Sequence, residues 1–213
     1  MLIYDNIFSK DEIQRLIEFY KDQPTSNERR HANGKLQRVV KSTDYNIKDS
    51  VPYNIIHDKL EALIGPHTFS GGHYVDSHLP YELHVDTVKH FQSKEGVFVA
   101  SDGQTGYGVL IPLIEGPEFK TLFFDHYIDD LQFGWKTLHH EDRSNTLPDN
   151  VMSMLTHQTP EELEEIKYLP LEGIADWKLG RVVTWPRNQL HCSSDFRKSG
   201  LTKQAVVVWV TTD

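Results

Sequence analysis

The chain has 213 residues, of which 38% are hydrophobic and 25% are charged, and its formal net charge is −9 at pH 7. This size and composition fit one globular domain, residues 1–213, with a single substantial core. The negative charge argues against nucleic acid as a partner, because sequence-independent binding needs many Lys and Arg side chains for the phosphates. No apolar run approaches the roughly 18 to 20 residues of a membrane-spanning helix, so we expect no membrane partner.

The single cysteine, Cys192, excludes an internal disulfide and a cysteine-based zinc cluster. The first residues, MLIYDNIFSKDE, lack the basic region and the apolar block of a signal peptide. Together these features predict a cytoplasmic location.

Two helices are predicted in the first third of the chain. In residues 9–21, Ser9 and Glu12 form a capping-box pattern, and apolar residues then follow at helical spacing. The segment 51–63, VPYNIIHDKLEAL, has apolar residues at the same intervals and predicts a second helix.

Between these helices, Asn33-Gly34 is typical of a two-residue turn in a β-hairpin. The hairpin is rich in basic residues, which either form a solvated face or form a rim that attracts anions. The solvated face is the simpler interpretation. The residues concerned are Arg29, Arg30, Lys35, Arg38 and Lys41.

After Gly65-Pro66 the sequence changes to short apolar runs separated by Gly, Asp and Pro, a pattern typical of an antiparallel barrel or jelly roll. Residues 125–160 break this rhythm, and their length and polarity predict an insert or lid within the domain, followed by a short helix that starts at Thr159. The predicted strands are 67–75, 79–87, 96–100, 107–114, 119–124, 167–171, 181–185 and 203–210.

The segment LPYELHVDT contains a candidate pair of metal ligands. Residues two apart in a strand point to the same face, so His84 and Asp86 would present an imidazole and a carboxylate side by side. His191, beyond the apolar run RVVTW, is the best candidate for a third ligand. Two histidines and one carboxylate on one side of a metal are the arrangement of non-haem Fe(II) oxygenases. The simpler alternative is a pair of polar residues at a strand end.

A second His-x-Asp pair, His140 and Asp142, competes for the same role. It lies in the polar segment 125–160, where no strand pattern would aim both side chains in one direction. It also leaves too few strands before His191 to complete a barrel, so we favour the earlier pair.

The last predicted strand begins with Lys203, whose side chain shares a face with the apolar residues Val207 and Trp209. A lysine pointing inward between them would bury a cation at considerable cost unless an anion meets it. A dicarboxylate cosubstrate would supply that anion.

The order of N-terminal helix, His-x-Asp, distal His and basic residue resembles the Fe(II)- and 2-oxoglutarate-dependent dioxygenases, and within them the prolyl-hydroxylase-like group. The segments DNIFSKDEIQRLIEFY, YELHVDT and KQAVVVWV carry the likeness. The resemblance implies a mostly β (α+β) fold, a double-stranded β-helix or jelly roll with supporting N-terminal helices. It implies that His84, Asp86 and His191 bind Fe(II), that Lys203 pairs with the distal carboxylate of 2-oxoglutarate, and that Tyr74 hydrogen-bonds this cosubstrate.

By the same resemblance the chain is expected to use O2 to hydroxylate an unactivated C–H bond, with ascorbate supporting activity. The substrate is expected to be a prolyl or other residue of a peptide or protein, or alternatively a free amino acid or small metabolite. A non-catalytic jelly-roll protein that binds a metal or ligand is the alternative from another class. Retention of Lys203 beside the three ligand residues argues against it, because such a protein has no need of the lysine.

Overall fold

The computed structural model describes residues 1–30, 34–86, 105–127 and 146–212, which form two antiparallel sheets and a few helices. The large sheet has seven strands in the order β1-β8-β5-β10-β4-β3-β2, and the small sheet has three in the order β7-β6-β9. The large sheet consists of β1 (Leu2–Tyr4), β2 (Thr25–Arg30), β3 (Leu36–Ser42), β4 (Thr68–Ser77), β5 (Thr105–Pro112), β8 (Val182–Pro186) and β10 (Lys203–Thr212). The small sheet consists of β6 (Lys120–Tyr127), β7 (Leu171–Asp176) and β9 (Gln189–Ser193).

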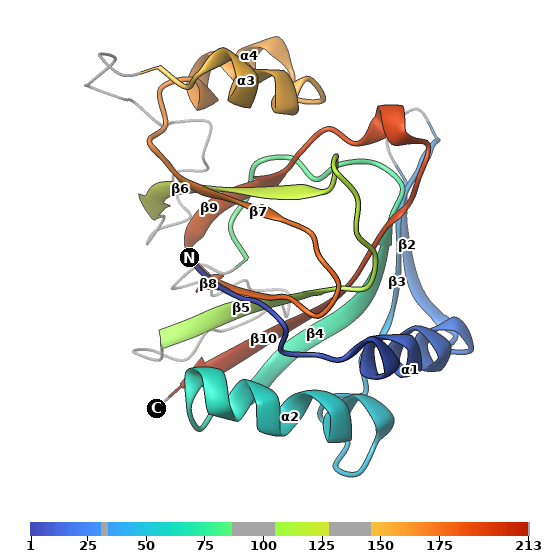
Figure 1. Cartoon of the computed structure of the whole chain (residues 1–213). Helices are drawn as coiled ribbons and strands as arrows, with labels where there is room; N and C mark the ends of the chain where they lie inside the picture. Colours follow the sequence, from blue (N-terminus) through green and yellow to red (C-terminus); the bar gives the residue numbers. More distant parts are fainter. Residues whose placement is uncertain (31–33, 87–104, 128–145, 213) are drawn as a thin grey trace, which may run out of the picture.

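The two sheets face each other, and helices cover their outer sides (Figure 1). Helices α1 (Lys10–Lys21) and α2 (Val51–Ile64) lie on the large sheet, while α3 (Asp149–Met152) and α4 (Pro160–Ile166) lie on the small sheet. Each interface between layers has its own apolar cluster. The middle cluster, which includes Phe123 and Ala205, joins one sheet to the other.

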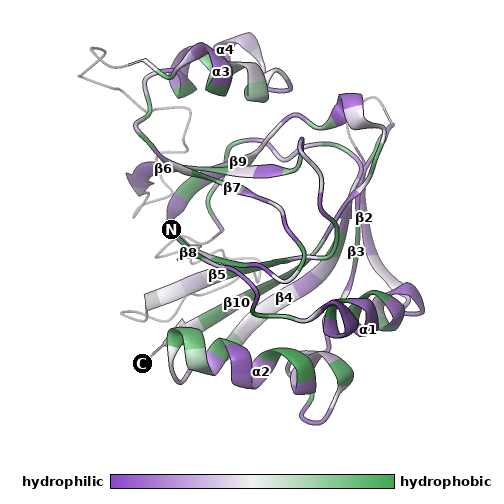
Figure 2. Cartoon of the chain, viewed as in Figure 1, coloured by the Kyte–Doolittle hydropathy of each residue, from purple (hydrophilic) through white to green (hydrophobic). Residues whose placement is uncertain are grey.

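Local sequence signals explain where the helices begin. Ser9 accepts a hydrogen bond from the backbone of Glu12, whose carboxylate accepts one from the backbone of Ser9, so the predicted capping box is confirmed. Thr159 and Glu162 repeat this arrangement at α4. In α1 the buried residues Ile13, Leu16 and Tyr20 follow helical spacing, and the opposite face is hydrophilic (Figure 2).

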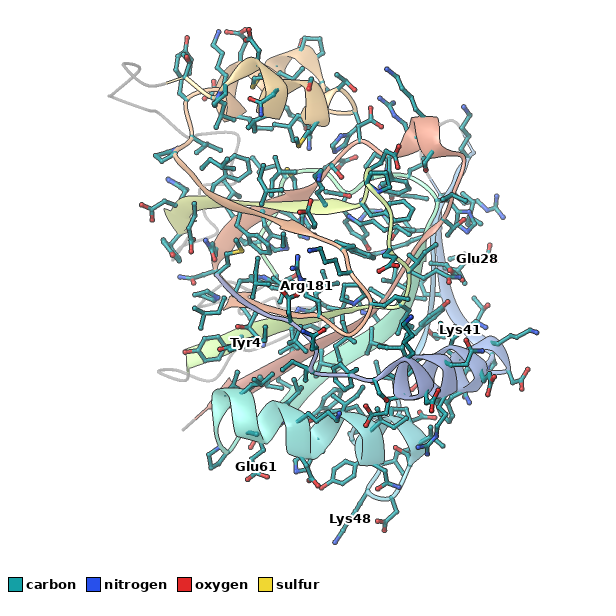
Figure 3. The ribbon with its side chains drawn as sticks, in the orientation of Figure 1. Tyr4, Glu28, Lys41, Lys48, Glu61 and Arg181 are labelled. Atoms are coloured by element: carbon teal, nitrogen blue, oxygen red, sulfur yellow. The ribbon has the colours of Figure 1, made fainter. Side chains whose placement is uncertain are left out.

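An ion pair fixes the amino-terminal segment beside the sheets. Arg181, labelled in Figure 3, donates to both carboxylate oxygens of Asp5, at 2.6 and 3.0 Å, and to the carbonyl oxygen of Asp176 at 2.7 Å. The guanidinium thereby ties the segment after β1 to the end of β7. No helix in the described part of the chain is both long and apolar enough to cross a membrane.

The structure corrects two of the predicted strands. Residues 79–86 form no strand, and their only bridge is the isolated pair of His84 with His191. Pro80 has no N–H to donate, which weakens a ladder there. Of the predicted strand 167–171, only Leu171 is in a strand, because α4 ends at Ile166 and the chain then turns.

The predicted hairpin and the predicted strand 96–100 involve residues outside the described ranges. Strands β2 and β3 pair antiparallel as far as Arg30 and Leu36, which confirms the hairpin, but residues 31–33 of its connection lie outside the description. The predicted strand 96–100 lies outside it as well.

The predicted insert 125–160 is partly integral to the fold. Its first residues, 125–127, continue β6, and Val151 and Leu155 near its end are buried in the cluster that covers the small sheet. Residues 128–145 lie outside the description, so the lid stays a prediction for them.

Candidate metal centre

The structure brings His84, Asp86 and His191 together between the two sheets. His191 lies in the middle of β9, and it exchanges both backbone hydrogen bonds with His84, at 2.9 and 3.0 Å. The backbone N–H of Asp86 donates to the carbonyl of Arg187 at 2.9 Å. The segment that carries the first two residues is therefore attached to β9 and to the turn before it.

The potential ligand atoms of these three residues all lie within 4.8 Å of one another. Asp86 Oδ1 is 3.9 Å from His84 Nε2, and Asp86 Oδ2 is 3.7 Å from His191 Nε2. Ligand atoms that share one ion at about 2.1 Å lie roughly 3 to 4 Å apart, so the spacing fits a single metal ion.

Hydrogen bonds orient the side chains of both histidines toward the common centre. Nδ1 of His84 lies 2.7 Å from the carbonyl of Glu82, and Nδ1 of His191 lies 2.9 Å from the carbonyl of Gln189. Because a carbonyl can only accept, each Nδ1 carries the proton and each Nε2 keeps a free lone pair for a metal.

The electrostatics of the site also suit a metal. Burial, with a smaller contribution from His191, lowers the pKa of His84 to about 4, so its imidazole is neutral at physiological pH. Metals bind the neutral form. Two imidazoles and one carboxylate are the donor set of Fe(II) sites that keep coordination positions open for other ligands. The residues present therefore fit Fe(II).

Another group, His57, Asp58 and Glu61 on α2, also brings three donor atoms close together. Both of its acidic residues are exposed, and it lies on the outer surface of the large sheet rather than in a cavity. The competing pair His140 and Asp142 lies outside the described residues.

A cavity of about 470 Å³ extends from the triad between the sheets. Lys203 lies in its wall with 3% of its surface exposed, so its predicted inward orientation is observed. Its Nζ donates to the carbonyl of Lys120 at 2.7 Å and to the hydroxyl of Ser193 at 2.9 Å, and it lies 4.0 Å from the ring centre of Trp177. Burial lowers the pKa of Lys203 well below the usual lysine value, and no carboxylate among the described residues pairs with it.

The prediction for Tyr74 is wrong. Its ring stacks on Tyr20 of α1 at 4.8 Å between centroids, and its hydroxyl donates to Asp76, so it belongs to the outer cluster. Side chains alternate along β4, and the neighbouring residues His73 and Val75 line the cavity instead. Tyr74 therefore lies on the face of β4 that points away from the cavity, where it cannot reach a cosubstrate.

Sequence reasoning missed three residues that complete the site. Trp185 donates a hydrogen bond from Nε1 to Asp86 Oδ2 at 3.0 Å. Thr121 and Ser193 are paired across β6 and β9, and both line the cavity beside Lys203. Ser193 could have been found from its position two residues after His191, but the other two depend on contacts between distant parts of the chain.

No protein-family model matches the sequence, and a search of curated proteins gives no match either. Solved structures do match. The non-heme alpha-ketoglutarate-dependent carbocyclase SnoK from nogalamycin biosynthesis is 12% identical, and the alignment covers 99% of this chain and 79% of that one with a TM-score of 0.61. HygX from Streptomyces hygroscopicus, solved with nickel and 2-oxoglutarate bound, is 13% identical over 99% of this chain and 82% of that one, with a TM-score of 0.58.

A third structure is the epimerase SnoN in complex with Fe3+, alpha-ketoglutarate and nogalamycin RO. It is 11% identical over 99% of this chain and 78% of that one, and its TM-score is 0.61. Alpha-ketoglutarate is another name for 2-oxoglutarate. The resemblance predicted from the sequence is thus confirmed at the level of the fold, which this chain shares with non-haem, 2-oxoglutarate-dependent enzymes.

Proposed function

We propose that the chain is an Fe(II)- and 2-oxoglutarate-dependent oxygenase, that its two sheets form a double-stranded β-helix (jelly roll), and that it hydroxylates a small molecule. His84, Asp86 and His191 would hold the iron. The observation that carries the proposal is the joint presence, in one cavity, of this inward-facing triad and a buried lysine with no carboxylate partner among the described residues.

The spacing along β9 supports 2-oxoglutarate as the cosubstrate. His191 and Ser193 are two residues apart on one strand face, which corresponds to about 6.5 Å. Ser193 accepts the hydrogen bond from Lys203, so the amine lies one such step from the metal site. A five-carbon dicarboxylate whose keto acid end bound the metal would extend its second carboxylate along β9 toward the lysine.

Thr121 is the proposed second contact to that distal carboxylate. Its oxygen accepts a hydrogen bond from Nε1 of Trp177 at 3.0 Å, so its own O–H proton is available to donate. The residue lies opposite Ser193 in the register of β6 and β9 and lines the cavity. A carboxylate there would meet an ammonium group and a hydroxyl donor, which suits its charge.

Bound Fe(II) with 2-oxoglutarate supplies the oxidising power, because O2 and the cosubstrate are converted to succinate and CO2 while one oxygen atom enters a substrate C–H bond. The chain supplies geometry and surroundings. The three residues that would hold the iron line the cavity, so the cosubstrate, O2 and the substrate would approach them from the cavity. Trp185 holds the carboxylate in place, and apolar walls such as Val75 and Leu110 limit the entry of water.

Two observations favour a small-molecule substrate. The cavity of about 470 Å³ falls within the range of sites that enclose small ligands. Solved structures of this fold contain hygromycin B, in HygX, and nogalamycin RO, in SnoN. Hydroxylation of a prolyl or other residue in a peptide stays a prediction from the sequence.

The proposal is tested by succinate formation. The protein is given Fe(II), ascorbate, 2-oxoglutarate and O2, with and without a panel of small molecules, and succinate is measured. We expect succinate only when Fe(II) is present, more of it with a true substrate, and none from His191→Ala. A non-catalytic binding protein would bind the metal and form no succinate under any of these conditions.

A further inference from the structure

Three basic residues and one serine form a row across the inner face of the large sheet. The register pairs Arg29 with Arg38 across β2 and β3, Arg38 with Ser77 across β3 and β4, and Ser77 with Lys203 across β4 and β10. All four residues line the cavity. Neighbouring strands lie about 4.8 Å apart, so the Cα atoms of Arg38 and Lys203 are separated by roughly two strand spacings.

The two arginines of this row have no anionic partner within the described residues. Arg30, the next residue along β2, pairs with Glu28, but no described carboxylate lies within 4.0 Å of Arg29 or Arg38. Glu82 also lines the cavity and is exposed, without an ion pair to either. Like charges directly opposite each other on paired strands are destabilising. An anion between the two guanidinium groups would reverse that effect.

One hydrogen-bond donor of Arg38 also lacks an acceptor among the described residues. Its Nε is buried and makes no hydrogen bond within the described structure. Burial, and to a lesser degree the charge of Arg29, lowers the pKa of Arg38. An unsatisfied buried donor on a cation is costly unless a ligand accepts from it.

The ring of Tyr81 lies between the guanidinium of Arg38 and the metal centre. Cζ of Arg38 lies 5.0 Å from the centre of the Tyr81 ring, and the Tyr81 ring centre lies 5.4 Å from that of His84. A cation held against an aromatic face keeps its edge free for hydrogen bonds. Arg38 is thus one aromatic ring away from a ligand of the proposed iron site.

The basic residues of the hairpin therefore divide between two faces. Lys41 points to α1 (Figure 3), where its Nζ donates to the carbonyls of Tyr20 and Lys21 at 2.8 and 3.1 Å. Arg29 and Arg38 line the cavity instead. The solvated-face interpretation does not describe Arg38, which is only partly exposed.

We propose that Arg38, with Arg29 beside it, binds an anionic group of the substrate, a carboxylate or a phosphate. This inference rests on the proposed function, in which Lys203 serves the cosubstrate and the arginine pair is left for the substrate. The planar fork of an arginine matches either anion with two hydrogen bonds. Held there, the anion would anchor the substrate across Tyr81 from the triad and bring the rest of the molecule toward the open side of the metal.

The test uses three probes that share one ring: benzoate, phenyl phosphate and the neutral benzamide. Each is titrated by calorimetry into protein loaded with Mn(II) and saturated with 2-oxoglutarate. We expect at least one anion to bind the wild type tenfold or more tightly than benzamide. Arg38→Gln should remove that preference, and Arg38→Lys should retain part of it. Arg30→Gln, which lies next to Arg29 on β2 and pairs with Glu28, should leave it unchanged. The anion that binds better identifies carboxylate or phosphate as the recognised group.

Three results would overturn the inference. One is that neither anion binds the wild type better than benzamide, and another is that Arg38→Gln, verified as folded by its circular dichroism spectrum, keeps the preference. The third is that Arg38→Gln weakens 2-oxoglutarate as strongly as Lys203→Met, which would assign Arg38 to the cosubstrate. Failure of the proposed function looks different, because the wild type would then form no succinate from 2-oxoglutarate with Fe(II) and O2, whichever probe it binds.

Discussion

Nε1 of Trp185 donates a hydrogen bond to Oδ2 of Asp86 at 3.0 Å, and that same oxygen lies 3.7 Å from Nε2 of His191. The indole therefore fixes the plane of the only carboxylate in the proposed metal site. Trp185 lies in β8 of the large sheet and His191 in β9 of the small sheet, so this hydrogen bond also connects the ligand group to the opposite wall of the cavity.

Replacing Trp185 by Phe keeps an aromatic ring and removes the N–H donor. Loss of a hydrogen bond that orients a metal ligand typically weakens metal binding 10- to 100-fold. We expect a decrease of about that size in Mn(II) affinity, measured by titration with electron paramagnetic resonance detection. Trp177→Phe is the matched control, because the indole of Trp177 donates its hydrogen bond to Thr121 and not to a residue of the proposed metal site. Equal Mn(II) affinity in Trp185→Phe and wild type would contradict the assigned role.

Gly108 gives Trp185 the space that it needs. A Cβ atom built at Gly108 would overlap the indole ring and come within 2.8 Å of its Nε1. We expect Gly108→Ala to displace the ring, to weaken Mn(II) binding as Trp185→Phe does, and to cost about 1 to 3 kcal/mol of stability through overpacking.

Gly71→Ala is the control for this prediction. Gly71 and Gly108 flank Trp209 in one row of the sheet, and a Cβ at Gly71 would meet the ring of Trp209 at 3.2 Å rather than Trp185. If the two alanine variants lowered Mn(II) affinity equally, crowding of the sheet and not the position of Trp185 would be the cause.

Local signals in the sequence predicted the parts of the fold that depend on neighbouring residues. The capping box at Ser9 predicted the start of α1, Thr159 predicted the start of α4, and apolar runs bounded by turn residues located β5 and β10. The two-residue period of a strand put Lys203 on the same face as Val207 and Trp209, and all three line the cavity.

Features that depend on pairing between distant segments could not be predicted. His84 and Asp86 were expected on a strand, but the segment is attached to β9 by an isolated bridge. Strand β9, QLHCS, is short and has no alternating pattern, so its existence follows only from its pairing with β6. Tyr74 was misassigned because the sequence alone does not say which face of β4 meets the second sheet.

Lys203 should destabilise the protein when no anion is bound. Replacing it by Met removes a buried amine that has no carboxylate partner among the described residues, and the carbonyl of Lys120 keeps a hydrogen bond from Ser194. We expect Lys203→Met to raise the free energy of unfolding by about 1 kcal/mol or more at pH 7 in the absence of ligand. Urea denaturation at several pH values measures this difference.

The same difference should depend on pH in a defined direction. Burial lowers the pKa of Lys203 in the folded state below its ordinary value of 10.5. Between the two pKa values the unfolded chain binds more protons, so the stability of the wild type rises with pH there. The extra free energy of unfolding of Lys203→Met over the wild type is therefore largest at the low-pH end of this range. It disappears as the pH approaches 10.5. An advantage that grew with pH would contradict a burial-lowered pKa.

Thr121→Val should weaken 2-oxoglutarate binding while preserving side-chain volume. The lost hydrogen bond to a charged group is worth about 1.5 kcal/mol or more, which corresponds to roughly tenfold in the dissociation constant. Thr121→Ser keeps the hydroxyl and should bind almost as wild type does. Calorimetric titration of 2-oxoglutarate into the Mn(II)-loaded variants distinguishes the two. Wild-type affinity in the valine variant would show that Thr121 does not bind the cosubstrate.

The central claim is that one cosubstrate spans the distance from the His84, Asp86 and His191 triad to Lys203. It is tested most directly by titrating 2-oxoglutarate and 2-oxovalerate, which lacks the distal carboxylate, into Mn(II)-loaded wild type and Lys203→Met. A buried charge pair of this kind is worth about 2 kcal/mol or more, so the wild type should prefer 2-oxoglutarate by roughly thirtyfold or more. The variant should lose most of this preference and bind 2-oxoglutarate weakly. Equal binding of the two compounds by the wild type, or an undiminished preference in Lys203→Met, would contradict the account.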